Sequence, residues 1–166
     1  MLVVSDASPL NILVRLEQVD VLASLFTAVV VPVFVAEEMS KPATPQIVRE
    51  WIAHPPSWLS VRAPTSAQPE GPLRHRGERD AIRLAQELSA DAILLDEDKP
   101  RTQATKLGLR VVGTIGVLEQ AANKGYLQNL KAVHERLRKT DFYISDDILN
   151  DSLARHLAYK RASVTE

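Results

Sequence analysis

The sequence predicts an α/β fold, in which a central parallel sheet is covered by helices. The first observation is that short apolar segments alternate along the chain with segments whose apolar residues recur at helical spacing. Such alternation is typical of a parallel sheet with helices on both faces. The second is the length of 166 residues, which suits one domain with a packed core. The third is the composition, because 45% hydrophobic and 25% charged residues match ordinary globular proteins.

Each expected element rests on local apolar spacing. Strands are expected where apolar segments are too short for helices, at residues 2–5, 28–31, 92–95 and 109–112. Helical spacing predicts helices at residues 10–16, 21–25, 32–39, 78–88, 99–107 and 114–124, and another that closes at Trp51 and Ile52. Pro32 suits a helix start and Gly125 a helix end. Residues 62–77 hold three prolines and Gly71 among polar residues, which predicts a mobile loop.

The C-terminal part departs from this alternation. Residues 127–137 and 148–159 show helical spacing with no strand between them. We therefore expect an α/β domain at residues 1–127 and a helical extension at residues 128–166 that packs on the same domain.

The composition excludes several classes of site and location. The chain has no cysteine, which excludes disulfides and thiolate metal sites and fits a cytoplasmic protein. No secretory signal is expected, and the longest apolar run, residues 28–36, is far short of the roughly 20 residues of a membrane span. The net charge of −1 means that nucleic acid would have to be bound through local basic groups.

Acidic residues gather at the positions where parallel α/β sheets bind ligands, beyond the carboxyl ends of the strands. They come from four segments: the residue after the first strand, the helix after the second, the start of the helix at 78–88, and the turn after the strand at 92–95. In chain order they are Asp6, Glu37, Glu38, Glu78, Asp80, Asp96, Glu97 and Asp98. The sequence thus predicts that carboxylates meet at one edge of the sheet.

Carboxylates that lie close together need a proton or a positive counter-charge. Two unit charges about 4 Å apart repel by roughly 4 kcal/mol at an effective dielectric near 20, so such a cluster is costly unless it is protonated or neutralised. Oxygen ligands without cysteine suit Mg²⁺ or Mn²⁺, which bind through a few carboxylates plus substrate phosphates. Phosphodiester hydrolysis is therefore the leading chemistry.

Each of these acids also has a purely structural interpretation. Asp6 could cap the helix that follows it, and by spacing alone a helix cap explains this residue as well as a metal site does. Glu37 and Glu38 could lie on a solvated helix face, and Glu78 and Asp80 could favour the positive end of their helix. The case for a metal site therefore rests on the joint placement of the four segments.

Four segments of the chain resemble the PIN domain family, particularly a VapC-like toxin branch. They are VVSDASPLNIL, VPVFVAEEM, ERDAIRLAQELSADAILLDEDK and LGLRVVGTIGVLEQAANKGYL, and the resemblance covers about residues 2–127. It implies a three-layer α/β/α fold and a Mg²⁺- or Mn²⁺-dependent endoribonuclease. It also implies the toxin role in a toxin–antitoxin pair, with RNA as substrate, a small antitoxin as partner and a possible homodimer.

The resemblance implies that Asp6, Glu37, Asp80 and Asp98 form the catalytic metal site. Asp80 and Asp98 match by their separation, whereas Asp96 stands where many relatives carry Thr or Ser, so the principal ligand of that pair stays open. The GERDAI segment resembles a branch in which the first acid is prominent, so Glu78 could share the role of Asp80. On a helix these two residues point about 200° apart, while Asp96 and Asp98 would share a face if the strand continued through them.

The resemblance and the local charge also suggest groups that bind the substrate. Ser8 and Asn11 match polar positions near the first acid. The basic candidates for phosphate contact lie beside the acidic helix start, and they are Arg74, His75, Arg76 and Arg79. A second basic group on the C-terminal helices could bind RNA or a partner. The histidines His54, His75, His134 and His156 lie outside the matched motifs and are expected at the surface rather than as metal ligands.

Other classes of α/β protein fit less well. A haloacid-dehalogenase-like phosphatase would need an aspartate where Ser8 stands, and a receiver domain would need an acidic pair where Ser5 precedes Asp6. No G-x-G-x-x-G follows a strand, which excludes the usual dinucleotide-binding site. The remaining alternative is a PIN scaffold that binds RNA or a protein partner without cutting.

Overall fold

The computed structural model describes residues 1–66 and 73–165, and its centre is a five-stranded parallel sheet. The strands are β1 (Leu2–Ser5), β2 (Ala28–Pro32), β3 (Leu59–Arg62), β4 (Ala92–Leu94) and β5 (Val111–Val112). They lie in the order β3-β2-β1-β4-β5, and every pair is parallel. This confirms the predicted α/β class and puts β1 in the middle of the sheet.

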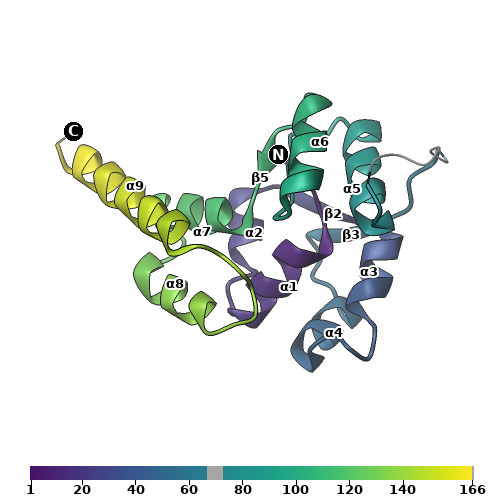
Figure 1. The fold of residues 1–166 in the computed structure, drawn as a ribbon, viewed down its shortest axis with the longest axis horizontal. Helices are drawn as coiled ribbons and strands as arrows, with labels where there is room; N and C mark the ends of the chain where they lie inside the picture. Colours follow the sequence, from purple (N-terminus) through teal and green to yellow (C-terminus); the bar gives the residue numbers. More distant parts are fainter. Residues whose placement is uncertain (67–72, 166) are drawn as a thin grey trace.

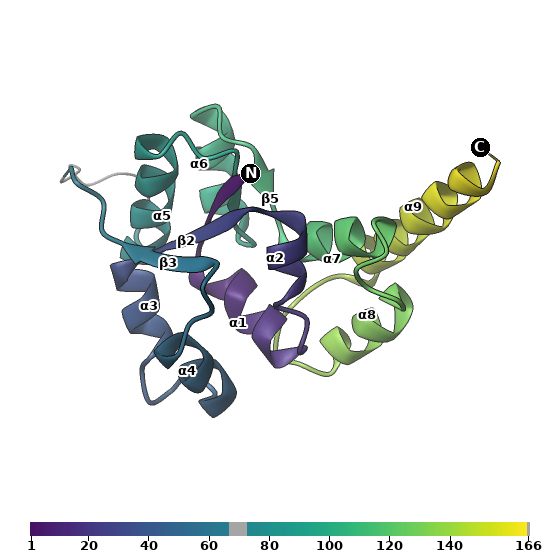
Figure 2. The ribbon, with the colours of Figure 1, turned by 180° about the vertical axis from the view of Figure 1, so that it is seen from behind.

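Helices surround the sheet, as Figures 1 and 2 show. The first six in the chain are α1 (Ala7–Arg15), α2 (Val21–Leu25), α3 (Val33–Met39), α4 (Gln46–Ala53), α5 (Arg76–Glu87) and α6 (Asp98–Lys106). They are followed by α7 (Thr114–Asn123), α8 (Leu130–Arg138) and α9 (Asp146–Val164). Most of these bounds lie within a few residues of those expected from the apolar spacing.

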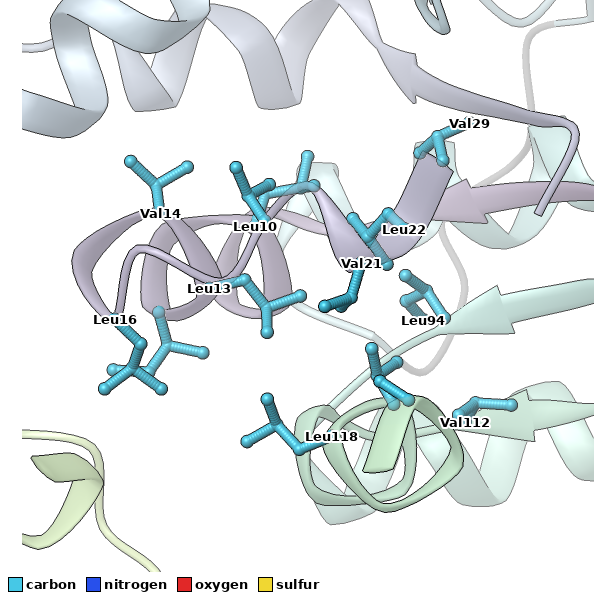
Figure 3. Packing of buried hydrophobic residues seen from close by; sticks show 14 of the residues in the cluster. Leu10, Leu13, Val14, Leu16, Val21, Leu22, Val29, Leu94, Val112 and Leu118 are labelled. Carbon is cyan, nitrogen blue, oxygen red and sulfur yellow. The ribbon is translucent and has the colours of Figure 1, made fainter. Parts of the chain in front are cut away.

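The alternation of side chains along the strands divides the core between the two faces of the sheet. Val3 packs with α1, α2 and α7 on one face, in the larger cluster that Figure 3 shows in part. Its neighbour Val4 packs with α5 and α6 on the other face. Leu10 and Leu118 are fully buried in the larger cluster, and truncating such a leucine to alanine typically costs about 2–5 kcal/mol. The result is the three-layer arrangement expected for a PIN-like fold.

The sequence did not predict strand β3. Only Leu59 of its four residues is buried, because β3 is an edge strand with one neighbour, β2. The strand has too few apolar positions for a periodic signal. The expected loop at residues 62–77 therefore begins one residue later, and its part at 67–72 lies outside the described residues.

The two C-terminal helices pack against α7 and against each other, and α9 then extends away from the rest of the chain (Figures 1 and 2). Asn129 caps α8 by accepting a hydrogen bond from the Ala132 N–H at 3.0 Å, and Ser145 caps α9 in the same way through Ile148. The division of the chain at residue 127 stays a prediction. Among the described helices, none has the length and apolarity that a membrane crossing requires.

Two of the four histidines are not at the surface, so that prediction is wrong for them. His134 on α8 and His156 on α9 are 3% and 8% exposed, because both helices turn these residues inward. The Nδ1 atom of His156 lies 2.7 Å from the side-chain oxygen of Asn123 on α7. His54 and His75 are exposed, as expected.

Candidate active site

Asp6 is the buried centre of the acidic site. It follows the central strand β1, its backbone N–H donates to the Leu94 carbonyl of β4 at 3.1 Å, and only 8% of the residue is exposed. Asp6 stands at the N-cap position of α1, yet its side chain makes no capping hydrogen bond. Helix capping therefore does not explain why a carboxylate is buried here.

Gly77 leaves a gap between the carboxylate of Glu38, on α3, and that of Asp6, at the end of β1. A Cβ atom at this position in α5 would lie 3.0 Å from Oε1 of Glu38 and 3.5 Å from Oδ1 of Asp6. Both carboxylate oxygens therefore face the same small space, which any side chain at residue 77 would fill. Val35 closes that space from α3, with Cγ2 3.3 Å from the same point.

Burial, and to a smaller extent the charges of the cluster, raise the pKa of Asp6. Burial raises the pKa of Asp6 from 3.8 to about 7; the backbone N–H of Ala7 opposes this, and the charges of Glu78, Glu38 and Asp96 add to it. Burial also raises the pKa of Glu78, opposed by His75 and reinforced by Glu97 and Glu38. Four segments of the chain therefore do bring acidic groups together, and without a cation these groups disfavour one another's charged forms.

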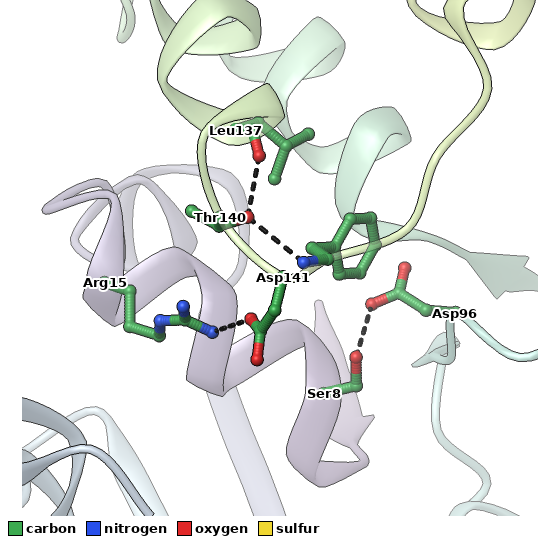
Figure 4. A network of polar contacts seen from close by, with 7 residues as sticks. Ser8, Arg15, Asp96, Leu137, Thr140 and Asp141 are labelled. Atoms are coloured by element: carbon green, nitrogen blue, oxygen red, sulfur yellow. Dashed lines mark hydrogen bonds and ion pairs between the residues drawn. The ribbon is translucent and has the colours of Figure 1, made fainter.

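Asp96 is held in place by three donors at the edge of the sheet. The backbone N–H of Thr114 donates to Oδ1 at 2.8 Å, and the Thr114 hydroxyl donates to Oδ2 at 2.7 Å. The Ser8 hydroxyl, on α1, donates to Oδ2 at 3.2 Å (Figure 4). Burial raises the pKa of Asp96, and these donors lower it in part. Asp96 is thus a rigid point that connects β4 with the starts of α1 and α7.

On α3 and α5, the acid that approaches Asp6 is not the one that the resemblance placed in the metal site. Glu38 faces Asp6, whereas Glu37 is exposed one position earlier on the same helix. Glu78 is buried and acts on Asp6, whereas Asp80 pairs with Arg76 at 3.4 Å. The reason is helix phase, because α3 and α5 each present one side to Asp6.

Asp98 also lies elsewhere than expected. The chain leaves the sheet after Leu95, and Asp98 is the first, exposed residue of α6. The expectation that Asp96 and Asp98 share a strand face is therefore wrong, because the strand does not continue through them. Asp98 and Glu97 still line the cleft described next, where they are closer to solvent than Asp96.

A cleft of about 1730 Å³ passes over this cluster. Its acidic lining includes Glu38 and Asp96, while Asp6 and Glu78 are buried beside them. Ser8 and Asn11 line it from α1. Its basic lining comes from both sides of the cluster and consists of Arg15, Lys41, Arg74, His75, Arg76, Arg101, Arg110 and Arg155. A polyanion could thus lie in the cleft although the net charge of the chain is only −1.

The predicted phosphate-binding arginines divide into two groups. Arg74 and Arg76 line the cleft, and the Arg76 guanidinium lies 4.7 Å from the centre of the Phe34 ring, which holds it at the cleft wall. Arg79 instead donates to the Leu73 carbonyl at 3.2 Å and is not part of the lining. Arg79 therefore has a structural contact rather than an exposed position for phosphate.

The donor set fits Mg²⁺ or Mn²⁺ held mainly through water. Within residues 1–66 and 73–165, no three acidic or imidazole side chains are close enough to form a complete metal site. Mg²⁺, however, usually keeps several waters and takes only one or two carboxylates from the protein. The Asp6 and Glu38 oxygens facing the gap at Gly77 offer two such carboxylates, and burial makes the charged form of Asp6 costly while it lacks a cation.

Sequence reasoning missed two residues of the site, Thr114 and Gly77. Thr114 comes two residues after the end of strand β5, so it lies at the same edge of the sheet that singled out Asp6 and Asp96. That rule would have found it if neutral donors had been considered with the acids. For Gly77 the sequence carries no such signal, because its importance depends on the packing of α3 against α5.

Comparisons with known proteins agree with this fold. The family model DUF3368, described as a PIN domain, matches residues 2–157. Among solved structures, the chain is similar to a PilT N-terminus domain protein from the hyperthermophilic archaeon Sulfolobus solfataricus P2. That likeness has a TM-score of 0.54 and 18% identity over 73% of this chain and 93% of the other, which supports the fold. No curated protein matches the chain.

PIN domains are generally nucleases that use divalent metal ions and commonly bind nucleic acids. The family match covers nearly the whole chain, including the strands and helices that carry the acidic cluster. The chain belongs to the PIN domain family.

Proposed function

We propose that this protein is a Mg²⁺- or Mn²⁺-dependent endoribonuclease. The observation that carries the proposal is the buried Asp6 carboxylate, whose pKa is raised by burial and by three neighbouring acids, two of which, Glu38 and Asp96, line a cleft with basic walls. Buried carboxylates of this kind are destabilising without a counter-charge. A functional reason to keep them together is that a cation and a phosphate bind there.

The chain's own residues would divide the work as follows. Asp6 and Glu38 would hold the cation, with Glu78 close by. Asp96, fixed by Thr114 and Ser8, would hold water close to the cation. Arg74 and Arg76 would bind phosphates of the RNA along the cleft wall. When bound, the divalent cation would neutralise the carboxylates and stabilise the negative charge that develops on the phosphate during hydrolysis.

The biological role that we propose is that of a toxin in a toxin–antitoxin pair acting in the cytoplasm, a proposal that rests on the resemblance to the VapC-like branch. A small upstream reading frame that encodes a DNA-binding fold with a flexible tail would support it. Induced expression of the protein should then arrest growth, and co-expression of the small protein should restore it. Continued growth on expression of a soluble, RNA-cleaving protein would contradict the toxin role and leave the nuclease proposal intact.

A non-catalytic PIN scaffold that binds RNA or a protein is the second candidate. The observation in its favour is that the described residues contain no complete three-ligand metal site. This candidate predicts RNA binding or partner binding without cleavage under any metal condition.

Cleavage of a panel of structured RNAs by the purified protein separates the two candidates. We expect cleavage with Mn²⁺, none after EDTA treatment, and none with Asp6→Asn at any Mn²⁺ concentration. Asp20→Asn is the matched control, because Asp20 is exposed and lies outside the cleft. Cleavage that survives both EDTA and Asp6→Asn would overturn the proposed mechanism.

A further inference from the structure

We propose that Tyr143 is a stacking platform for a base of single-stranded RNA in the same cleft as the acidic cluster. Tyr143 lies in the linker between α8 and α9 and lines the cleft together with Asp141 and Phe142. The inference deepens the proposed ribonuclease function, because it specifies single-stranded RNA as the substrate and assigns a residue that binds it.

The linker is fixed to the body of the protein. Arg15 on α1 donates to the Asp141 carboxylate at 2.6 Å, and this ion pair connects the linker with the helix that follows Asp6. The Thr140 hydroxyl donates to the Leu137 carbonyl at 2.7 Å and accepts from the Phe142 N–H at 3.2 Å. Figure 4 shows that the linker passes over α1 near the Ser8–Asp96 contact.

Tyr143 is exposed although its neighbours in the linker are anchored. Phe142 and Ile144, on either side, pack against the hydrophobic core, whereas Tyr143 is 95% exposed. The alternation turns Tyr143 outward while its neighbours hold the backbone in place. Because the backbone on both sides of Tyr143 is anchored, stacking on a base requires ordering only the Tyr143 side chain, whose ring offers a large flat surface.

The surroundings of Tyr143 favour nucleic acid over an apolar ligand. Arg15, Arg110 and Arg155 line the same cleft, and all three are placed to approach a phosphate chain. Arg15 and Arg155 are each oriented by an ion pair, with Asp141 and Glu119 respectively. An exposed aromatic ring in a cleft that is also lined by arginines is the combination by which proteins bind single strands, with bases stacked on aromatic side chains and phosphates on arginines.

The geometry favours single-stranded over duplex RNA. Bases inside a duplex are stacked on each other, so a protein ring can stack only on an unpaired base. The deep groove of A-form RNA also excludes side chains from the base edges. A strand whose base rests on Tyr143 would place its backbone in the cleft that passes over Glu38 and Asp96.

Binding of short fluorescent oligoadenylate by the full-length protein in EDTA tests the inference. We expect Tyr143→Ala and Tyr143→Leu to weaken binding about 5- to 150-fold, the range for loss of one stacked base, and Tyr143→Phe to retain it. Tyr126→Ala is the matched control, because Tyr126 is 49% exposed but lies outside the cleft. Binding of a duplex, and of an abasic strand of the same length, should not change in Tyr143→Ala.

The outcomes distinguish this inference from the nuclease proposal. If wild type cleaves RNA and Tyr143→Ala binds oligoadenylate as tightly as wild type, the stacking role is wrong and the nuclease proposal stands. A loss of binding that is equal for duplex, abasic and intact strands would also overturn it, since that pattern indicates a general disturbance of the cleft. If wild type binds no single-stranded RNA, the cleft serves another partner and the inference fails.

Discussion

Replacing Asp6 by asparagine should stabilise the metal-free protein, and the gain should depend on pH. Burial and neighbouring acids raise the pKa of Asp6 from 3.8 to about 7, so the folded state holds this proton more tightly than the unfolded state does. The stability of metal-free wild type must therefore fall as the pH rises from about 4 to about 7, and then level off. Asparagine carries no charge and avoids this loss.

The size of the effect follows from the shift. A difference of about three pH units between the folded and unfolded pKa of Asp6 corresponds to about 4 kcal/mol at pH 8, at 1.36 kcal/mol per unit. At pH 4 the same relation leaves only about 0.5 kcal/mol. Asp6→Asn should therefore exceed wild type in unfolding free energy by up to about 4 kcal/mol at pH 8, and should nearly match it at pH 4.

Urea unfolding of EDTA-treated proteins at pH 4, 6 and 8 measures this difference. Asp20→Asn is the control, because it makes the same change at an exposed position. Added Mn²⁺ should stabilise wild type at pH 8 and not Asp6→Asn, since a ligand stabilises only the protein that binds it. A difference between Asp6→Asn and wild type that is constant with pH, or a destabilised Asp6→Asn at pH 8, would refute the electrostatic reasoning.

Three further predictions concern the groups around Asp6. Glu38→Gln should lower Mn²⁺ affinity at least 10-fold in calorimetric titration, roughly the loss of one charged contact with the metal. Glu37→Gln removes no such contact and should lower the affinity less than 2-fold. Equal losses in the two variants would show that α3 turns a different side to the metal. Gly77→Ala should abolish Mn²⁺ binding with a melting temperature close to wild type, because its methyl group fills the gap while alanine favours the helix; unchanged Mn²⁺ binding would contradict this. Thr114→Val should lower the free energy of unfolding in urea at pH 8 by about 1.5–3 kcal/mol and should lower the cleavage rate, because the Asp96 carboxylate loses a hydrogen bond. Full cleavage activity in this variant would show that Asp96 is not part of the active site.

Most of the succession of strands and helices along the chain was predictable, because it depends on local signals. The apolar strand before Asp6 and the helical spacing after it need no tertiary information. Strand β3 was not predictable in this way, since it contributes only Leu59 to the core and its pairing with β2 is a tertiary contact.

The segments of the acidic site were predictable, and the individual residues were not. A carboxylate that directly follows a central strand, such as Asp6, must lie at the sheet edge. On a helix, adjacent residues such as Glu37 and Glu38 differ by about 100° in direction. Which of them faces Asp6 depends on how α3 packs against α5, and the sequence carries no measure of that. The bend at Glu97, the N-cap of α6, separates Asp96 from Asp98 for a similar reason.

The burial of the two histidines on the C-terminal helices also depends on helix packing, which the sequence does not reveal. Polar residues are usually exposed, so a surface position was the reasonable expectation for His134 and His156. His134 lies on the otherwise apolar buried side of α8, and His156 lies on the buried side of α9, where Asn123 of α7 provides its partner. Only the packing of three helices together could have shown this.

The location of Mn²⁺ in crystals grown with the metal tests the central claim most directly. Anomalous scattering would locate the ion without any assumption about activity. We predict a peak in the gap at Gly77, between the Asp6 and Glu38 carboxylates, with water completing the shell toward Asp96. A peak at Asp80 or Asp98 with the gap empty would contradict the account.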